Sequence, residues 1–159
     1  MLEPIIFAAV MALPSSDDRE LSLQRPSRSV SAVRLASTVP PRWRGFAACV
    51  LRRESGATLD RAQSGVGAQN PSSSAAGRWQ MLSGWREGGA WNVQKRLVRF
   101  GAPKAQAREV RVYLQRTPIH RWSGVWQDMA AYEALESGGW RAWYAPGSPC
   151  NALVPGGER

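Results

Sequence analysis

Residues 43–56 read WRGFAACVLRRESG and predict the helix against which the rest of this chain packs. At about 100° per residue, one stripe of that helix collects its apolar side chains: Trp43, Phe46, Ala47, Val50 and Leu51. Glu54 falls on the same stripe, roughly 20° from Trp43 after eleven steps, so we expect its carboxylate on the packed side. Gly56 provides the left-handed residue that commonly ends a helix, which places Glu54 in the last turn.

Glu54 is the candidate catalytic residue of the chain. Partial burial and the negative end of the helix dipole both disfavour a charged carboxylate at this position. A carboxyl group that keeps its proton near neutral pH can act as a general acid. The alternative is a surface glutamate that pairs with Arg52 or Arg53, and this helix alone leaves both interpretations open.

Length and charge limit the kinds of partner. The 159 residues suffice for one domain, and a net charge of +9 favours a polyanion. Nucleic acid, an anionic membrane and the acidic wall of a bacterium all meet that condition. The chain has eight Trp against three Phe and three Tyr, which suits either sugar stacking in a cleft or ordinary core packing. No aromatic platform is interleaved with the basic residues, so we expect no nucleic-acid partner. The apolar run over residues 4–13 is too short to cross a bilayer, so we expect no stable membrane insertion.

Cysteine and histidine content argues against a metal or a cofactor. His120 is the single histidine, and no CxxC pair occurs. Cys49 and Cys150 are separated by nearly the whole folded segment, which fits either one long-loop disulfide or two buried thiols. We therefore expect no cofactor and no metal site, and composition leaves the state of the two thiols open.

The two ends of the chain are expected to lie outside the domain. Residues 4–13 are apolar but too short to cross a bilayer. They resemble the apolar core of a signal peptide, except that Glu3 occupies the position where a basic residue is expected. The segment is therefore interpreted either as an export signal or as an incidental apolar end of the chain. The Ser-, Arg- and Pro-rich stretch that follows completes a flexible lead over residues 1–41. The domain is then expected over 42–152, with a loose tail at 153–159.

The middle of the chain predicts helices joined by one long loop. Residues 57–74 are dense in Gly, Ser, Gln and Asn and predict a functional loop or a small irregular hairpin. The helices expected after the loop are a short one over 84–90 capped by Ser83, a basic amphipathic one over 91–100, one opened by Pro103, and one from Ser123 or Gly124 to Gly138-Gly139.

Taken in order, these segments resemble the transglycosylase-like, or resuscitation-promoting-factor-like, branch of the lysozyme-like fold. That branch includes exported cell-wall enzymes of actinobacteria and similar domains of their phages. The matching pieces are Cys49, residues 53–56, residues 70–81, residues 126–135, residues 139–143 and Cys150. Each piece alone is weak, but their order over about residues 42–152 is fairly specific. The resemblance implies an α+β, mostly α, lysozyme-like domain with a cleft and at most a minimal sheet.

The resemblance also implies roles for single residues. Glu54 becomes the general acid and base that cleaves the β-1,4 bond between N-acetylmuramic acid and N-acetylglucosamine in peptidoglycan. Gln80 and Trp79 would line the cleft beside it, and Asn70 and Ser72 would contact the glycan as well. The partner would then be a peptidoglycan glycan strand bound by a monomer.

The family's paired cysteines imply a disulfide between Cys49 and Cys150 that ties the catalytic helix to the last turn of the domain. Such a protein is secreted or associated with the cell wall, or serves a phage in lysis or in its virion. The host, bacterium or phage, is left open.

A second carboxylate, which many glycosidases use, is not evident. Asp60, Glu87 and Asp128 are the candidates, and each is interpreted as a solvated charge. Glu136 repeats the Glu-Ser-Gly tripeptide but is followed by a helix stop, so it is not favoured. A single acid suits lytic transglycosylation, although simple hydrolysis stays open if Asp60 reaches the cleft. The alternatives are a non-catalytic wall-binding or virion-structural module of the same fold and a basic nucleic-acid-binding protein.

Overall fold

The computed structural model describes residues 28–157, and within them the domain is mostly helical. The elements are α2 (Arg28–Ala36), η1 (Pro41–Trp43), α3 (Arg44–Ser55), α4 (Trp85–Arg99), α5 (Lys104–Arg116), η2 (Ile119–Arg121), α6 (Gly124–Glu136), η3 (Gly139–Trp143), η4 (Pro149–Leu153) and η5 (Pro155–Gly157). Strand pairing in this part of the chain is limited to two isolated bridges, Gln69 with Ala76 and Ala76 with Met81. The mostly helical class expected from the sequence is confirmed.

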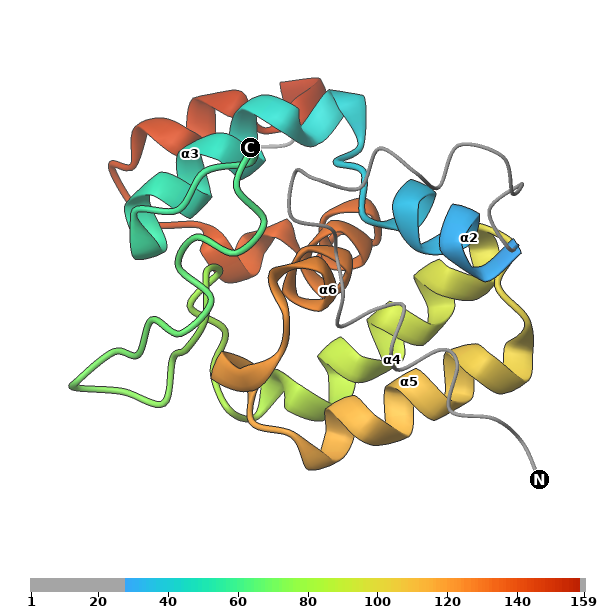
Figure 1. Ribbon diagram of the computed structural model, residues 1–159. Coiled ribbons are helices and arrows are strands. Elements are labelled where there is room, and N and C mark those ends of the chain that lie inside the picture. The colour runs from blue at the N-terminus through green and yellow to red at the C-terminus, as the bar shows by residue number, and fades with distance from the viewer. Residues whose placement is uncertain (1–27, 158–159) are drawn as a thin grey trace, which may run out of the picture.

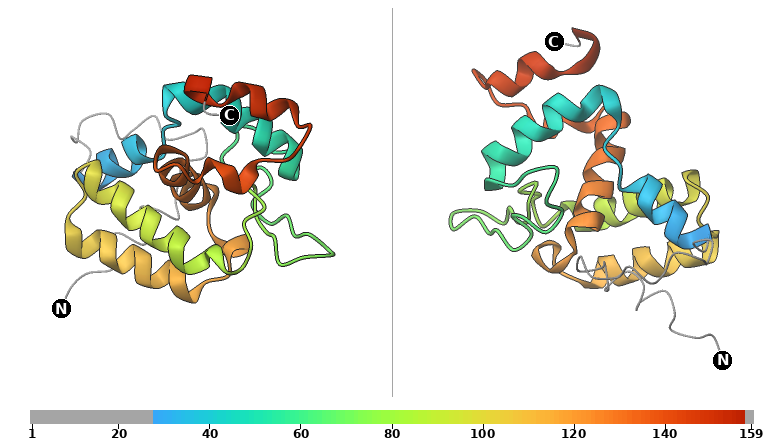
Figure 2. Two further views of the ribbon diagram at one scale, coloured as in Figure 1. Left: turned by 180° about the vertical axis from the view of Figure 1, so that it is seen from behind. Right: turned by 45° about the horizontal axis from the view of Figure 1, so that its top comes forward.

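Helix α6 runs through the centre of the molecule. Every residue from Gly124 to Leu135 is buried. Helices α4 and α5 pack together on one side of α6, whereas α3 and the C-terminal 3-10 segments lie on the other (Figure 1). Figure 2 shows the same arrangement from behind and from above. The long loop before α4 extends along one end of this core.

Helix α3 forms as its sequence predicts. Its apolar stripe is buried, with Trp43, Phe46 and Leu51 at 4%, 0% and 0% exposure. Gly56 ends the helix in the left-handed region, at a φ of 69°, and its N–H bonds to the carbonyl oxygens of Arg52 and Leu51. Leu153 from η4 lies beside the start of this helix, 4.0 Å from the position of a Cβ on Gly45.

The domain extends beyond both predicted boundaries. Residues 28–41 were expected in the flexible lead, but α2 is a helix whose Ala32 and Ala36 are buried against α4. Arg96 fixes the end of α2, because its Nε donates to the Ala36 oxygen at 2.5 Å and its Nη2 to the Thr38 oxygen at 3.1 Å. At the other end, Val154 belongs to the core at 8% exposure rather than to a loose tail. The apolar segment 4–13 lies outside the described residues.

Helix α4 is one continuous helix, which corrects the predicted division into 84–90 and 91–100. The helix passes through two adjacent glycines, Gly88 and Gly89, without a break. A Cβ on Gly89 would lie 3.3 Å from the Trp122 ring, so this glycine lets the ring pack against the helix backbone. Ser83 does not cap the helix, because the residue that precedes the first turn is Gly84 and no side chain bonds to the free N–H groups. Within the described range, no helix combines the length and apolarity that a membrane crossing needs.

Candidate active site

Glu54 lies in the last turn of α3, as predicted, and its side chain is 23% exposed. It is therefore neither fully buried nor freely solvated. Its Oε1 accepts two hydrogen bonds from Arg53, at 2.9 Å from Nε and 2.6 Å from Nη2. These are the contacts of an ion pair, which is the pairing with Arg53 that the helix pattern had left open beside a general acid.

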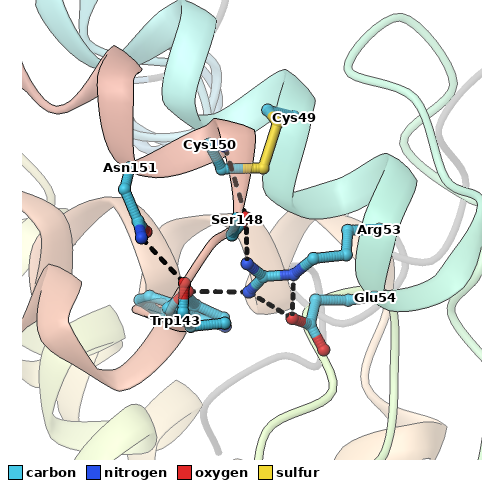
Figure 3. Close-up of a disulfide and its surroundings, with 8 residues drawn as sticks. Cys49, Arg53, Glu54, Trp143, Ser148, Cys150 and Asn151 are labelled. Carbon is cyan, nitrogen blue, oxygen red and sulfur yellow. Dashed lines mark hydrogen bonds and ion pairs between the residues drawn. A yellow bond between two sulfur atoms is a disulfide. The ribbon is translucent and has the colours of Figure 1, made fainter.

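Arg53 connects this carboxylate to the C-terminal part of the chain. Its Nη2 also donates to the Trp143 carbonyl oxygen at 2.7 Å, and its Nη1 donates to Ser148 Oγ at 2.9 Å (Figure 3). The guanidinium thus has three partners from two chain segments. From the sequence, Arg53 was considered only as a possible ion-pair partner of Glu54. Its bridging role could not be predicted, because Trp143 and Ser148 lie 90 and 95 positions further along the chain.

A disulfide fixes the same two segments to each other. Cys49 of α3 and Cys150 of η4 are bonded, with their Cα atoms 5.5 Å apart, and Figure 3 shows the bond one turn above Arg53. The pairing implied by the family resemblance is confirmed. The disulfide is compatible with an extracellular protein.

The segment that contains Gln80 lies against the end of α3. Ser55 Oγ donates to the Arg78 oxygen at 2.8 Å, and the Trp143 indole N–H donates to the Trp79 oxygen at 2.9 Å. Gln80 itself is half-buried and has a φ of 47°, in the left-handed region that non-glycine residues rarely occupy. Strain of this kind concentrates at functional positions. The two residues that precede Gln80, Arg78 and Trp79, are thus bonded to Ser55 at the end of α3 and to Trp143.

Trp79 does not line an exposed surface, which corrects its predicted contact with substrate. Its side chain is 0% exposed and packs edge-on against Tyr132, with ring centroids 5.8 Å apart. The ring centroid of Trp143 lies 5.4 Å from it on another side. Trp79 is a core residue, whereas the family resemblance had implied that it lines the cleft next to Gln80.

Asn70 and Ser72 form a local turn. The Asn70 Oδ1 accepts from the Ser72 N–H at 2.9 Å and from the Ser72 hydroxyl at 2.8 Å. Ser72 is exposed and Asn70 is half-buried. Their recorded hydrogen bonds serve the loop itself, and none reaches Glu54, so their predicted contact with glycan stays a prediction.

Asp128 is buried at 4% exposure, which corrects its interpretation as a solvated charge. It forms an ion pair with Arg78 at 2.9 Å and accepts the Trp79 indole N–H at 2.8 Å. Burial raises the pKa of Asp128 from its ordinary 3.8 to about 6, although the Arg78 guanidinium and the Trp79 N–H oppose the shift. Between about pH 4 and 6 the folded protein holds a proton that the unfolded chain has lost, so stability falls as the pH rises through this window.

The long loop is held to α6 by two buried polar side chains that sequence reasoning did not single out. Arg78 donates to the Thr58 and Arg61 oxygens, both at 2.7 Å. Gln127 accepts the Arg78 N–H at 2.7 Å and donates to the Val66 oxygen at 3.2 Å. Gly77 was the one sign of this contact in the sequence, because glycine allows the backbone to approach another group closely. Its φ is 77°, and a Cβ at this position would lie 2.2 Å from the Gln127 amide oxygen. These bonds give the predicted irregular loop a defined path beside the end of α3.

The other carboxylates lie elsewhere. Glu136 is engaged with Arg96 at 2.5 Å and with Arg99 at 3.1 Å, as part of a cluster with Glu133 on α4 and α6. Asp60 is 89% exposed in its side chain and lies 4.0 Å from Arg44, and Glu87 is exposed on α4. The ion pairs of Asp60 and Glu136 thus involve arginines other than Arg53.

The surface hollows among the described residues include three that differ in position. One of about 560 Å³ lies along α5, one of about 600 Å³ lies between η3 and η4, and one of about 230 Å³ contains Asp60 and Asp128. None of these three is lined by Glu54 or Gln80. The second is lined by Ser148, the hydroxyl partner of Arg53, and so adjoins the candidate site.

Fold and site together define a mostly helical, disulfide-linked domain with one partly exposed carboxylate held by a bridging arginine. Across residues 28–157, no group of three or more His, Cys, Asp or Glu is arranged to hold a metal ion. No protein-family model matches this chain, and no curated protein or solved structure matches it either.

Proposed function

We propose that this protein cleaves the glycan strands of peptidoglycan at the β-1,4 bond between N-acetylmuramic acid and N-acetylglucosamine, with Glu54 as general acid and base. The observation that carries the proposal is the position of Glu54. It is a partly exposed carboxylate in the last turn of α3, a helix with one buried apolar face, in the place that the family resemblance reserves for the acid. The same resemblance implies a secreted or wall-associated protein.

The contacts of Arg53 bear directly on how Glu54 would act. Protonated Glu54 gives its proton to the glycosidic oxygen as the bond from that oxygen to C1 of muramic acid breaks. The resulting carboxylate then removes the proton of the C6 hydroxyl of the same sugar while the C6 oxygen bonds to C1, which gives an anhydro product and restores the protonated acid. The carboxyl group must turn away from Arg53 to do so. Arg53 would keep two acceptors, the Trp143 oxygen and Ser148 Oγ, so its guanidinium would stay in place while Glu54 moves.

Gln80 would bind the sugar next to the cleaved bond. Its amide Nε2 donates to the Gly77 oxygen at 3.0 Å, which fixes the side chain and leaves its amide oxygen, Oε1, available as an acceptor. Sugar hydroxyl and acetamido N–H groups are the donors that such an oxygen accepts. The left-handed backbone at Gln80 sets the direction of this side chain.

The test is a wall-clearing assay on purified peptidoglycan with the wild type, Glu54→Gln and the matched control Glu87→Gln. General acid catalysis contributes at least about a hundredfold, so Glu54→Gln should lose that much activity. Glu87 is exposed on α4, and its substitution should change nothing. Equal clearing by the wild type and Glu54→Gln would refute the assignment of the acid.

The ion pair itself favours a second candidate function. A glutamate whose Oε1 is bound twice by Arg53 is also what a non-catalytic wall-binding module would contain. Such a module would co-sediment with purified wall, release no fragments, and bind equally well as Glu54→Gln. Release of anhydro or reducing sugar ends by the wild type would exclude it.

A further inference from the structure

The solvent side of α5 is basic. Among the 13 residues of this helix are four basic side chains and a single acidic one, Glu109. Three of the basic residues, Lys104, Arg108 and Arg116, are exposed. Within residues 28–157, no carboxylate forms an ion pair with any of these three. We call Lys104, Arg108 and Arg116 the α5 basic row.

Interactions within the fold do not explain these charges. Lys104 occupies the first turn of α5, where the positive end of the helix dipole disfavours a cation. Arg78 and Arg96, by contrast, are buried and hold carboxylates of α6. Positions at which a local stabilising rule is broken are expected to serve function. The α5 basic row is therefore a candidate surface for an anionic partner.

The row follows the axis of the helix. At about 1.5 Å per residue, Arg108 lies about 6 Å along α5 from Lys104, and Arg116 lies about 12 Å further on. A hollow of about 560 Å³ lies along the same helix and is lined by both arginines. The row thus offers a line of cations about 18 Å long, which suits a chain that carries its own charges at intervals.

This surface lacks the side chains that a membrane or a nucleobase needs. Besides the basic row, the exposed residues of α5 are Ala105 and Glu109, so the helix presents no large apolar side chain that could insert among lipids. Its one aromatic residue, Tyr113, is half-buried. The helix itself therefore offers no open aromatic face on which bases stack.

The neighbouring aromatic ring is already in use. Trp91 of α4 is 45% exposed, but the guanidinium carbon of Arg111 lies 3.9 Å from its ring centroid and covers one face. This contact fixes the fourth basic side chain of α5 against α4. The exposed side of α5 therefore favours a partner that is recognised by charge alone.

We propose that the α5 basic row binds a linear, flexible polymer of polyol units joined by phosphodiesters and attached to a cell wall. Each repeat of such a polymer carries one negative charge and neither a base nor a lipid tail. Rotation about its single bonds lets successive phosphates reach Lys104, Arg108 and Arg116. The inference rests on the proposed function only in taking the polymer from the wall.

Binding on α5 leaves the candidate acid free. Helix α5 lies on one side of α6, whereas α3, which carries Glu54, lies on the other (Figure 1). A wall polymer held on α5 would keep the protein at the wall and raise the local concentration of glycan near Glu54. The polymer and the glycan would then occupy different faces of one molecule.

The test is fluorescence anisotropy of labelled poly(glycerol phosphate) titrated with the full chain at about 50 mM and about 200 mM NaCl. The α5 variant is Lys104→Gln/Arg108→Gln/Arg116→Gln, which removes three charges and keeps residues that favour a helix. It should bind the polymer at least about tenfold more weakly at the lower salt concentration, because charge supplies the affinity. The slope of log K against log salt should become shallower by about 2, since each contact in a single-stranded polyanion contributes about 0.7.

The matched control is Arg42→Gln/Arg61→Gln/Arg141→Gln. Its three residues are exposed, lie outside α4 and α5, and lower the net charge by the same amount. The control should keep most of the affinity, and equal weakening in both triple variants would overturn the inference, because net charge and not α5 would then bind.

A single variant, Arg108→Glu, covers the case in which the α5 triple variant does not fold. It reverses one charge in the middle of the row and should also weaken binding of poly(glycerol phosphate). Wild-type affinity in Arg108→Glu and in the α5 triple variant would overturn the inference. Tighter binding of a short DNA duplex, or of phosphatidylglycerol vesicles, at equal phosphate concentration would overturn it as well, because the partner would then be a nucleic acid or a membrane.

A clearing assay separates this inference from the proposed function. Wall treated with hydrofluoric acid loses its phosphodiester polymers, so the α5 triple variant should clear it like the wild type and should clear intact wall more slowly. Glu54→Gln should bind poly(glycerol phosphate) like the wild type. Polymer binding without any clearing would refute the proposed function alone, whereas clearing without polymer binding would refute only the role of α5.

Discussion

Replacing Cys49 and Cys150 together by serine is expected to destabilise the fold by several kcal/mol. The two cysteines are 101 positions apart, and the loss of chain entropy on closing a loop of that length corresponds to about 4.7 kcal/mol at 25 °C. Removing a native disulfide from a small domain typically costs about 2–5 kcal/mol, so the expected decrease lies toward the upper end of that range.

The assay is equilibrium urea unfolding followed by tryptophan fluorescence. Three samples are compared: the oxidised wild type, the double serine variant, and the wild type treated with a phosphine reductant. The reduced wild type should unfold at the same urea concentration as the double variant, because both lack the same covalent link. The matched control is Ser148→Ala, which removes the hydrogen bonds that the Ser148 hydroxyl accepts from Arg53 and from the Cys150 N–H and should lower the free energy of unfolding by about 2 kcal/mol.

The bond also positions the candidate site, so activity should fall with stability. Without it, η4 is held to α3 chiefly by the contact of Ser148 with Arg53 and by packing, and Arg53 loses a fixed partner. We expect the double variant to clear peptidoglycan more slowly even in buffer without urea. Coincident unfolding curves for all three samples would refute the entropic argument.

Three further predictions concern the segment around Gln80 and the core behind it. In urea unfolding, the free energy of unfolding of Gln80→Gly should be about 1 kcal/mol higher than that of Gln80→Ala, because only glycine is unstrained at a φ of 47°. Equal free energies of unfolding would argue against backbone strain at this position. The chemical shift of the Trp79 indole N–H should change with a midpoint near pH 6, because this group donates to Asp128, whose pKa is raised to about 6 by burial. The change should disappear in Asp128→Asn, and a midpoint near pH 4 would contradict the burial argument. Gly124→Ala should lower the free energy of unfolding by about 3 kcal/mol or more, because its Cβ would lie 1.5 Å from the carbonyl oxygen of Ala62 in the loop. Its control is Gly67→Ala, where a Cβ would meet nothing within 4 Å and the urea unfolding midpoint should not change.

Local pattern in the sequence was enough to predict the helix that carries the candidate acid. The spacing of Phe46, Val50 and Leu51 determines which face of α3 is buried, and Gly56 determines where the helix ends. Both depend on neighbours within a few turns, so no distant contact is needed. The disulfide was reached from the ordered resemblance rather than from spacing, which had left free thiols open.

Tertiary structure alone decided what meets the acidic side chains. Helix α6 is buried on every side, so it has no polar face, and the sequence gives no sign that Asp128 points at Arg78 from 50 positions away. Likewise, the position of Glu54 on its helix indicates that it faces inward, but the Arg53 contacts depend on where η3 and η4 dock. Periodicity reports the direction of a side chain because it is a property of one helix, whereas a charge partner from another segment is fixed only when the whole chain is packed.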